Sequence, residues 1–518
     1  MAKPQERKSR SLLRSSSLVG LMTLLSRVMG LARDIVIAHS FGAGASADAF
    51  FVAFKIPNFL RRLFAEGAFA QAFVPVLSEY RTQGSLAEVK QLVDRVAGSL
   101  GLVLTLITAV AVLAAPLLAM AFAPGFYLRD AAKYQLTVEL LRLTFPYLLF
   151  ISLTAFAGSI LNSYDRFAVP AFTPVLLNLS LIGSVFWLQP LMDTPVMALA
   201  WGVVIAGVTQ LLLQLPFLAR VHLLPRPRVD FKHQGVRKII TLMLPALFGV
   251  SVSQINLMLD TVLASLLQTG SVSWLYFSDR LVELPLGVFG IAIATVILPS
   301  LSRKHAERSP EAFAAMLDWA MRMVLLIGIP AALALWLLAE PLLVTLFQYG
   351  AMTPEDVTQA SYSLRAYSLG LLAFMLIKVL APGYFSRQDT RTPVKIGVLA
   401  MAVNMLLNLA LIVPLAHAGL ALATSLSAFL NAGLLLRGLL RDGVMRWQAG
   451  WLRFVLQLSC ANLAMAVLLV LWVPELSQWL SWSVWDRAMA MALSCVLGGA
   501  LYVIVLLLLG VRLRQLRH

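Results

Sequence analysis

The sequence is poor in charge, in cysteine and in recognisable catalytic motifs. Charged residues make up 13% of its 518 positions, whereas soluble globular proteins have about 25%. The two cysteines, Cys460 and Cys495, lie inside late apolar runs, so neither a disulfide framework nor a metal site is expected from them. No Walker-type glycine loop, His-Glu-x-x-His motif or paired-carboxylate site is present in the sequence. The chain is therefore not expected to be an enzyme, and ATP is not its evident energy source.

Hydrophobic residues are abundant, at 60% of the chain, and long apolar runs recur from Leu18 to Leu509. Because a spanning helix needs roughly 20 apolar residues, this length predicts an all-α polytopic membrane protein with about fourteen transmembrane helices. Arg27 and Arg33 interrupt the first run and no small-residue cleavage site follows it, so an uncleaved first span is expected. The predicted spans lie near 17–38, 49–78, 97–122, 136–162, 170–188, 196–219, 239–267, 272–301, 314–346, 361–385, 394–414, 418–436, 454–473 and 488–511.

The net charge of +16 is explained by the loops between these spans. With the N-terminus placed inside, the inside segments hold 28 Lys or Arg residues and the outside loops hold only Arg129, Lys133 and Arg487. Basic residues concentrate in the cytoplasmic loops of membrane proteins. We therefore predict a multi-pass inner-membrane protein with both termini in the cytoplasm, and no nucleic-acid partner is needed to explain the charge.

Two polar segments recur along the chain at a nearly constant offset. Residues 74–78 (Val-Pro-Val-Leu-Ser) return as residues 298–302 (Leu-Pro-Ser-Leu-Ser), and Asp165-Arg166 followed by Pro170 returns as Asp389-Thr390-Arg391 followed by Pro393. The offsets are 224, 224 and 223 residues, which indicates a duplicated six-helix unit. The two lobes should be parallel repeats around a central cavity, a carrier's architecture. We predict an N-lobe at 1–220 (spans 1–6), a C-lobe at 221–441 (spans 7–12) and two extra C-terminal helices at 442–518.

Ten cations fall within the predicted spans, namely Arg27, Arg33, Lys55, Arg61, Arg62, Arg142, Arg280, Arg322, Arg365 and Lys378. Each would cost about 2.5–3.5 kcal/mol facing lipid at a helix centre. They must therefore snorkel to an interface, face a watered cavity or pair with an acid, and a buried structural salt bridge is the alternative to a functional role for each of them. Arg27, Arg33, Arg61 and Arg280 outnumber nearby acids, and arginine forks suit phosphate capture. These four predict an anionic ligand such as a phosphate or pyrophosphate.

Span two carries several charges on one face. On an ideal helix Asp48, Lys55, Arg62 and Glu66 share a stripe. Arg62 and Glu66 are also four residues apart, which suits an internal ion pair, and Pro57 should kink the span. In span eight, Arg280 and Glu283 lie at i and i+3.

A second set of polar residues predicts either a cation site or interhelical contacts. Asn404 and Asn408 lie four residues apart in span eleven, Thr424 lies in span twelve and Asp260 lies in span seven. One carboxylate with amide and hydroxyl oxygens suits a hard cation such as sodium, but asparagines also join membrane helices by hydrogen bonds. The six histidines, His417 among them, are expected to be solvated.

Several of these residues lie in motifs of a known family. Ser26–Asp34 (SRVMGLARD), Asp48–Lys55 (DAFFVAFK), Pro57–Arg62 (PNFLRR) and Ala65–Phe69 (AEGAF) are similar to signatures of the lipid II flippase family MurJ (MviN). Gly270–Trp274 (GSVSW), Asp279–Leu281 (DRL) and Tyr384–Asp389 (YFSRQD) are further matches. The likeness covers essentially the whole chain, and it places the chain near the multidrug/oligosaccharidyl-lipid/polysaccharide (MOP) exporter superfamily.

This resemblance implies a two-lobed exporter fold and translocation of lipid II, the undecaprenyl-pyrophosphate-linked peptidoglycan precursor, to the periplasmic leaflet. It implies substrate-binding roles for Arg27, Arg33, Asp48, Arg61 and Arg280, supported by Lys55, Glu66 and Glu283. It also implies a polyprenyl-tail groove in the last two spans. Some members have a sodium site at positions matching Asp260, Asn404, Asn408, Thr424 and the carbonyl of Leu420. Asn408 stands where such members have an acid, which leaves sodium coupling open.

We therefore expect an alternating-access flippase for peptidoglycan biosynthesis and cell shape, with lipid II and membrane lipids as partners. Three rival functions stay open at this point. A cation-coupled drug exporter of the same fold predicts an acid-rich cavity, and an exporter of another polyprenyl-linked saccharide is separated only by the family match. A membrane scaffold for cell-wall synthases predicts that Arg27→Ala and Arg280→Ala leave growth intact.

Overall fold

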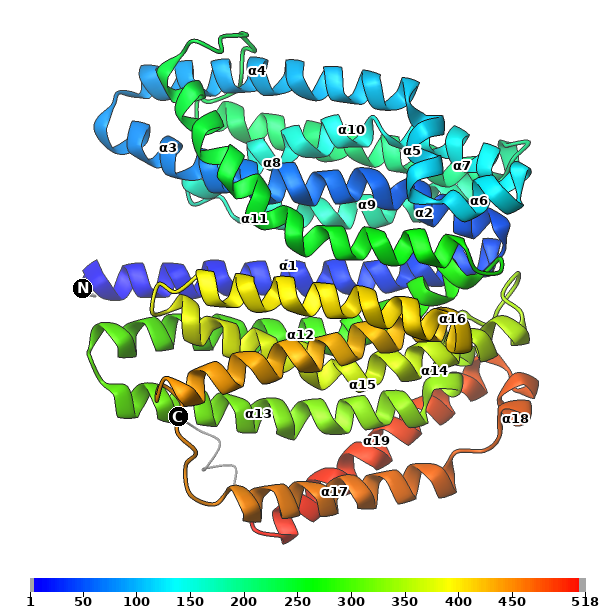
Figure 1. Ribbon diagram of the computed structural model, residues 1–518. Helices are drawn as coiled ribbons and strands as arrows, with labels where there is room; N and C mark the ends of the chain where they lie inside the picture. Colours follow the sequence, from blue (N-terminus) through cyan, green and yellow to red (C-terminus); the bar gives the residue numbers. More distant parts are fainter. Residues whose placement is uncertain (1–3, 512–518) are drawn as a thin grey trace. The chain divides into compact units, whose positions relative to one another are not determined.

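The computed structural model describes the backbone of residues 4–511, together with side chains from residue 18 onward except 64–66, 248–250, 252–253, 289–296 and 298–299. Every regular element within this part of the chain is a helix, which confirms the predicted all-α class (Figure 1). The chain divides into two compact units, Met1–Val272 and Ser273–His518.

The first unit is built from helices α1 to α11, joined mostly by short connections. They are α1 (Pro4–Phe41), α2 (Ala45–Arg61), η1 (Arg62–Phe69), α3 (Ala70–Gln83), α4 (Leu86–Leu113), α5 (Ala115–Phe122), α6 (Pro124–Arg129), α7 (Ala131–Thr144), α8 (Tyr147–Ser163), α9 (Ala168–Trp187), η2 (Gln189–Leu191), α10 (Met197–Arg220) and α11 (Gln234–Ser265). Its closest helix pairs include α9 with α10, α1 with α9, and α2 with α7.

Span two departs from an ideal helix after Arg61. Pro57 lies inside α2 without ending it, and one turn later the chain enters a π-helix, η1, before continuing as α3. A π-helix has wider turns than an α-helix, so it shifts the phase of every residue that follows. The predicted stripe from Asp48 to Glu66 is therefore interrupted at its second half, because Arg62 and Glu66 lie in η1. The side chain of Glu66 is outside the described residues.

The second unit holds the remaining helices and the C-terminal hairpin. They are α12 (Ser271–Ala306), α13 (Pro310–Leu337), α14 (Ala339–Phe347), α15 (Pro354–Phe385), α16 (Arg391–Arg441), α17 (Trp451–Trp472), α18 (Leu476–Ser481) and α19 (Val484–Leu508). The main packed pairs are α15 with α16, α13 with α15, and α17 with α19.

The 51-residue segment α16 is two helices joined by a sharp kink, and the two halves diverge from the α16 label in Figure 1. Ala416, two residues after Pro414, has φ 50° and ψ −129°, which no helix contains. A side chain on Gly419 would meet the carbonyl oxygen of Leu411 at 2.2 Å, so only glycine permits this close approach. The kink agrees with the two separate spans predicted here. His417 lies beside it and is only 2% exposed, so its expected solvation is wrong.

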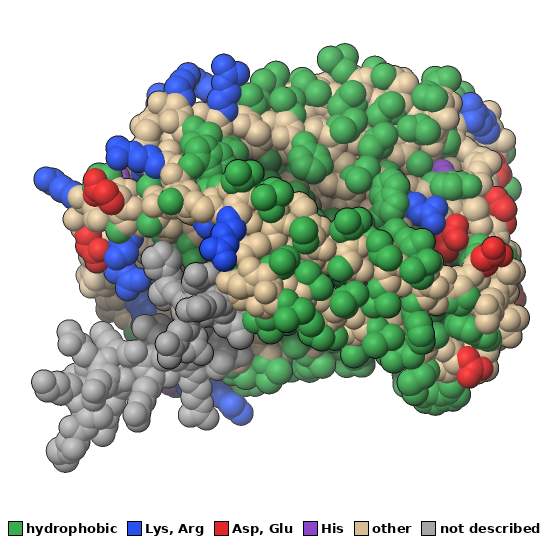
Figure 2. Space-filling model, turned by 90° about the horizontal axis from the view of Figure 1, so that it is seen from below, with side chains coloured by type: hydrophobic (Ala, Val, Ile, Leu, Met, Phe, Trp, Pro, Cys, Tyr) green, Lys and Arg blue, Asp and Glu red, His purple; other side chains and the backbone are tan. Residues whose placement is uncertain are grey.

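Each of the fourteen predicted spans falls on helical chain, with breaks of one or two residues inside three of them. Nine helical segments of the described chain are long and apolar enough to cross a membrane, with α16 counted once and α7–α8 taken together. On the face shown in Figure 2, hydrophobic side chains cover the broad middle, and most charged side chains gather toward its ends. This distribution is the one that a bilayer requires.

The connection between α10 and α11 is fastened to the first unit. The backbone N–H of Arg226 donates to Asp94 Oδ1 at 2.7 Å, and that of Arg228 donates to the Asp94 carbonyl at 3.0 Å. At its end, His233 Nδ1 accepts from Gly235 N–H at 3.2 Å and caps α11. Burial, followed by the nearby Arg95, lowers the pKa of His233, which favours the neutral imidazole that can accept this hydrogen bond.

These contacts explain why α11 groups with the first unit, where it packs on η1 and α3. The compact units therefore divide after Val272, fifty-two residues beyond the boundary expected from the repeat. A repeat boundary reflects duplication and a contact boundary reflects packing, so the division into 1–220, 221–441 and 442–518 stays a prediction.

The C-terminal hairpin is anchored to the rest of the second unit by a cluster around Asp318. Asp318 accepts from Trp451 Nε1 at 2.6 Å and from Arg322 Nε at 2.8 Å. Arg322 also lies 4.9 Å from the centroid of the Trp451 ring. These contacts support the structural interpretation of Arg322. At the other end Arg487, placed in an outside loop from sequence, is instead only 5% exposed and donates to the carbonyls of Trp479, Leu480 and Gln348.

Candidate functional site

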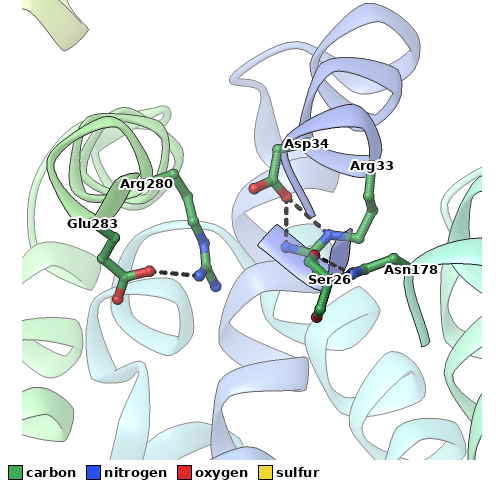
Figure 3. Close-up of polar contacts among 6 residues, drawn as sticks. All are labelled: Ser26, Arg33, Asp34, Asn178, Arg280 and Glu283. Atoms are coloured by element: carbon green, nitrogen blue, oxygen red, sulfur yellow. Dashed lines mark hydrogen bonds and ion pairs between the residues drawn. The ribbon is translucent and has the colours of Figure 1, made fainter. Parts of the chain in front are cut away.

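Arg33 is held in a buried network in the first unit (Figure 3). Its guanidinium donates to Asp34 Oδ1 from Nε at 2.9 Å and from Nη2 at 2.7 Å, and Nη1 donates to Asn178 Oδ1 at 2.9 Å. Asn178 on α9 then donates from Nδ2 to the carbonyl of Ser26 at 3.0 Å. The side chains of Arg33 and Asp34 are 9% and 2% exposed. The network joins α1 to α9, so Arg33 has a structural partner set of its own in this conformation.

Arg280 in the second unit also pairs with a carboxylate, but this pair is partly exposed to solvent. Nη1 donates to Glu283 Oε2 at 2.8 Å, three residues along α12, as Figure 3 shows. The guanidinium carbon lies 4.9 Å from the centroid of the Tyr276 ring. The Arg280 and Glu283 side chains are 35% and 41% exposed, so both groups remain accessible. An accessible guanidinium stacked on an aromatic ring keeps its orientation and can still exchange one oxyanion for another.

The other predicted cations of the first unit differ in exposure. Arg61 ends α2, and its Nε donates to Asn58 Oδ1 at 3.2 Å. Arg27 on α1 is partly buried, whereas Lys55 on α2 and Arg62 on η1 are exposed. The predicted Arg62–Glu66 ion pair lies outside the described side chains.

Asp48 is completely buried, with 0% exposure. Its Oδ2 accepts from Lys133 Nζ at 2.8 Å and from the backbone N–H of Gly270 at 2.8 Å. Lys133 lies in the first turn of α7 and is 5% exposed, so it belongs to a helix and not to a loop as predicted. Sequence reasoning missed this pair because the two residues are 85 positions apart. One signal in the sequence could have drawn attention to Lys133: it is one of only three cations in the predicted outside loops.

The residues proposed for sodium lie in both units. Asp260 is on α11, whereas Asn404, Asn408, Leu420 and Thr424 are on α16. On α16, Asn404 is 1% exposed, and neither atom of its amide has a hydrogen-bond partner among the described residues. Thr424 Oγ1 donates to the carbonyl of Leu420 at 3.0 Å. The orphaned amide of Asn404 is compatible with a further polar ligand, although oxygen donors of this kind do not specify sodium by themselves. Among the described residues, no group of three or more His, Cys, Asp or Glu side chains is arranged so that it could hold a metal ion.

The structure thus separates the predicted arginines into different environments. Arg27, Arg33 and Arg61 belong to the first unit, and Arg280 belongs to the second. Within the units, the structure joins Arg33 to Asp34, Asp48 to Lys133 and Arg280 to Glu283. The predicted site residues did not include four of the partners found here, namely Asp34, Lys133, Asn178 and Tyr276.

Comparison with known proteins gives a consistent result. A family model described as lipid II flippase MurJ matches residues 37–510. A probable lipid II flippase MurJ from Vibrio cholerae serotype O1 is 52% identical over 515 residues, covering 98% of both chains. A lipid II flippase MurJ from Burkholderia cenocepacia is 42% identical over 98% of this chain and 99% of its own.

Solved structures show the same relationship at the level of the fold. A structure described as lipid II flippase MurJ in an inward closed conformation matches with a TM-score of 0.78 and 26% identity, over 94% of this chain and 97% of that chain. An inward-facing multidrug resistance MATE transporter of the MOP superfamily matches with a TM-score of 0.67 and 14% identity, over 82% and 98%. These are transporter families rather than enzyme families. From this full-length agreement we conclude that the chain belongs to the lipid II flippase MurJ family, within the fold shared by MOP transporters.

Proposed function

We propose that this protein moves lipid II from the cytoplasmic to the periplasmic leaflet of the inner membrane by alternating access. The observation that carries the proposal is full-length similarity to lipid II flippases combined with an accessible guanidinium, Arg280, in a chain that is 60% hydrophobic. Lipid II is an amphiphile whose diphosphate cannot cross hydrocarbon unaided, because burying an unpaired charge is very costly.

Arg280 is the residue best suited to receive the diphosphate. A phosphate oxygen offers the same kind of charge-assisted hydrogen bond that Glu283 now accepts. Because both side chains are more than a third exposed, exchanging the carboxylate for a phosphate leaves no buried unpaired charge. Tyr276 keeps the guanidinium plane oriented during this exchange. Arg27 and Arg61 are proposed as further phosphate contacts, since their guanidinium groups have the same planar fork of donors.

The buried residues are proposed to act differently. Arg33 holds α1 against α9 through Asp34 and Asn178, and Asp48 is buried beside Lys133. Both therefore support the site through packing in this conformation, and Lys55 is proposed as an auxiliary cation because it is exposed. Glu283 acts as the resident counter-ion of Arg280.

Orientation and energy source follow from charge. We propose that both termini lie in the cytoplasm, and the excess of Lys and Arg in alternate loops supports this orientation. Each elementary charge that crosses 100 mV is worth about 2.3 kcal/mol, so the membrane potential assists or opposes each step according to the net charge moved. The polyprenyl tail is proposed to stay in a groove beside α17 and α19, facing lipid.

Sodium coupling is a separate proposal. The carboxylate of Asp260, the amides of Asn404 and Asn408, the hydroxyl of Thr424 and the carbonyl of Leu420 would supply its oxygen ligands. Bound sodium would supply a positive charge that balances Asp260. The orphaned amide of Asn404 supports this proposal, whereas the occupation of the Leu420 carbonyl by Thr424 weakens it.

Outer-leaflet accessibility of lipid II tests the function. In cells depleted of the native protein, accessibility should fall, and re-expression should restore it. Arg27→Ala and Arg280→Ala variants should insert at normal levels and fail to restore it. Lys304→Met is the control, because Lys304 forms a surface ion pair with Glu307. Unchanged accessibility after depletion would reject the flippase function. Intact growth with both arginine variants would favour a scaffold for cell-wall synthases instead.

A further inference from the structure

A short segment of the first unit, from α6 into α7, is fastened to the end of α11 and the turn that follows it. Gly125 N–H donates to Ser265 Oγ at 3.2 Å, and Arg129 donates from Nη1 to the carbonyl of Leu266. One turn later Lys133 Nζ lies 3.4 Å from Thr269 Oγ1. We call these three contacts, made by Gly125, Arg129 and Lys133, the α6–α7 clasp.

The contacts of the clasp follow the same chain direction on both segments. Gly125, Arg129 and Lys133 are four residues apart, and their partners advance from Ser265 to Thr269 in the same direction. The fit at the first contact is close, because a Cβ on Gly125 would lie 1.9 Å from the carbonyl oxygen of Ser265. The segment 265–270 is therefore held along its length, and its position depends on α6 and α7.

The Asp48–Lys133 ion pair lies at the end of the clasp, beside Gly270. Asp48 Oδ2 accepts from both Lys133 Nζ and Gly270 N–H at 2.8 Å. Lys133 also lies 4.1 Å from the centroid of the Phe126 ring, which confines its ammonium from another side. Gly270 has a φ of 101°, a conformation that favours glycine and turns its N–H toward the carboxylate.

Gly270 immediately precedes α12, the helix that carries Arg280. We infer that Lys133 is a positioning residue for translocation: by neutralising Asp48 it holds the Gly270 turn, which fixes where the α12 helix begins. The inference rests on the proposed function for its transport readout, and on the first unit alone for its structural readout. A buried carboxylate that loses its cation is strongly destabilised, so without Lys133 the turn should separate from α2 and become hydrated.

The structural readout is the protection of residue 271 from a thiol reagent. Ser271 is 0% exposed and its hydroxyl has no hydrogen-bond partner among the described residues, so Ser271→Cys is a mild change. The substitution is made in a Cys460→Ser, Cys495→Ser background, since both native cysteines are exposed. The purified full-length protein is placed in nanodiscs, where a hydrophilic maleimide reaches both sides of the membrane.

Lys133→Met should raise the labelling rate of Ser271→Cys by about tenfold or more, as expected when removal of one buried charge frees a segment. Lys304→Met, which removes a lysine from a surface ion pair, is the matched control and should leave labelling unchanged. Equal labelling rates with and without the Lys133→Met substitution would overturn the inference, whatever the transport assay shows.

The transport readout distinguishes a positioning role of Lys133 from a contribution of Lys133 to the stability of the protein alone. Lys133→Met should lower the amount of lipid II in the outer leaflet by more than any fall in the amount of variant protein in the membrane explains. The double variant Asp48→Asn, Lys133→Met carries no lone buried charge and should regain a normal membrane level, yet transport should stay low because the turn is held only by a neutral amide. Recovery of transport in proportion to protein level would show a merely structural role and reject the inference. If instead the unaltered protein moves no lipid II while labelling responds as expected, the proposed function fails and the clasp stands.

Discussion

The Arg33–Asp34 pair in the first unit and the Arg280–Glu283 pair in the second have the same chemistry in different surroundings. The first is 9% and 2% exposed and gains a third member in Asn178 on another helix. The second is 35% and 41% exposed and lies along a single helix. Breaking the first pair leaves a buried charge that water cannot solvate, whereas breaking the second leaves two charged groups that water can solvate. Burial therefore assigns Arg33 to structure in this conformation and leaves Arg280 available for a ligand.

The largest effect should come from Arg33→Ala. It would leave the Asp34 carboxylate buried without the guanidinium of Arg33. Removal of one member of a buried ion pair lowers the free energy of unfolding by about 3–5 kcal/mol. The free energy of unfolding in detergent and the membrane level should both fall. Arg33→Lys keeps the charge but cannot contact Asp34 and Asn178 together, so it should recover part of the loss. Unchanged stability in Arg33→Ala would remove the distinction between the two pairs.

Arg280→Ala should act on transport instead of stability. A hydrogen bond to a charged group contributes about 1.5–3 kcal/mol, so the affinity for the diphosphate should fall by roughly tenfold to a hundredfold. The unfolding free energy should change by less than about 1 kcal/mol, because the Glu283 pair is partly solvated. A variant that unfolds as readily as Arg33→Ala would show that Arg280 is structural too.

A smaller change is expected from Glu283→Gln, which removes the anion that competes with phosphate for Arg280. Exposed ion pairs are worth about 0.2–1 kcal/mol, so binding of inorganic pyrophosphate to the purified protein should strengthen by no more than severalfold. Weaker pyrophosphate binding would mean that Glu283 orients Arg280 for the ligand.

The smallest effect should come from Lys304→Met, which removes a surface pair with Glu307 at 3.5 Å. Its unfolding free energy should stay within about 0.5 kcal/mol of the unaltered protein, with normal lipid II accessibility. A larger loss in this variant would mean that exposure does not predict the cost of breaking an ion pair in this protein.

Much of the fold could be predicted from the sequence because spanning helices require long apolar runs. The predicted spans fall on helical chain, and the separation of spans eleven and twelve corresponds to the kink at Ala416. The π-helix η1 could not be predicted, because nothing in the residues 62–69 distinguishes it from an α-helix by periodicity. The face that the residues of span two would share on an ideal helix is therefore not kept beyond Arg61.

The site was predictable in its residue types and less so in its pairings. Arg280 and Glu283 are three residues apart on one helix, so their contact follows from helical spacing. Asp48 and Lys133 meet only through packing of α2 on α7, and Arg33 meets Asn178 only through packing of α1 on α9. No spacing rule reaches such long-range pairs, and charge counting placed Lys133 in a loop although it is buried in α7.

Direct binding of lipid II is the measurement closest to the central claim that an accessible guanidinium receives the diphosphate. Purified protein in nanodiscs would be titrated with lipid II and with the same polyprenyl chain lacking phosphate, for the unaltered protein and for Arg280→Ala. Arg280→Ala should weaken lipid II binding by about tenfold or more and leave binding of the phosphate-free lipid unchanged. Equal lipid II affinity in the two proteins would contradict the account.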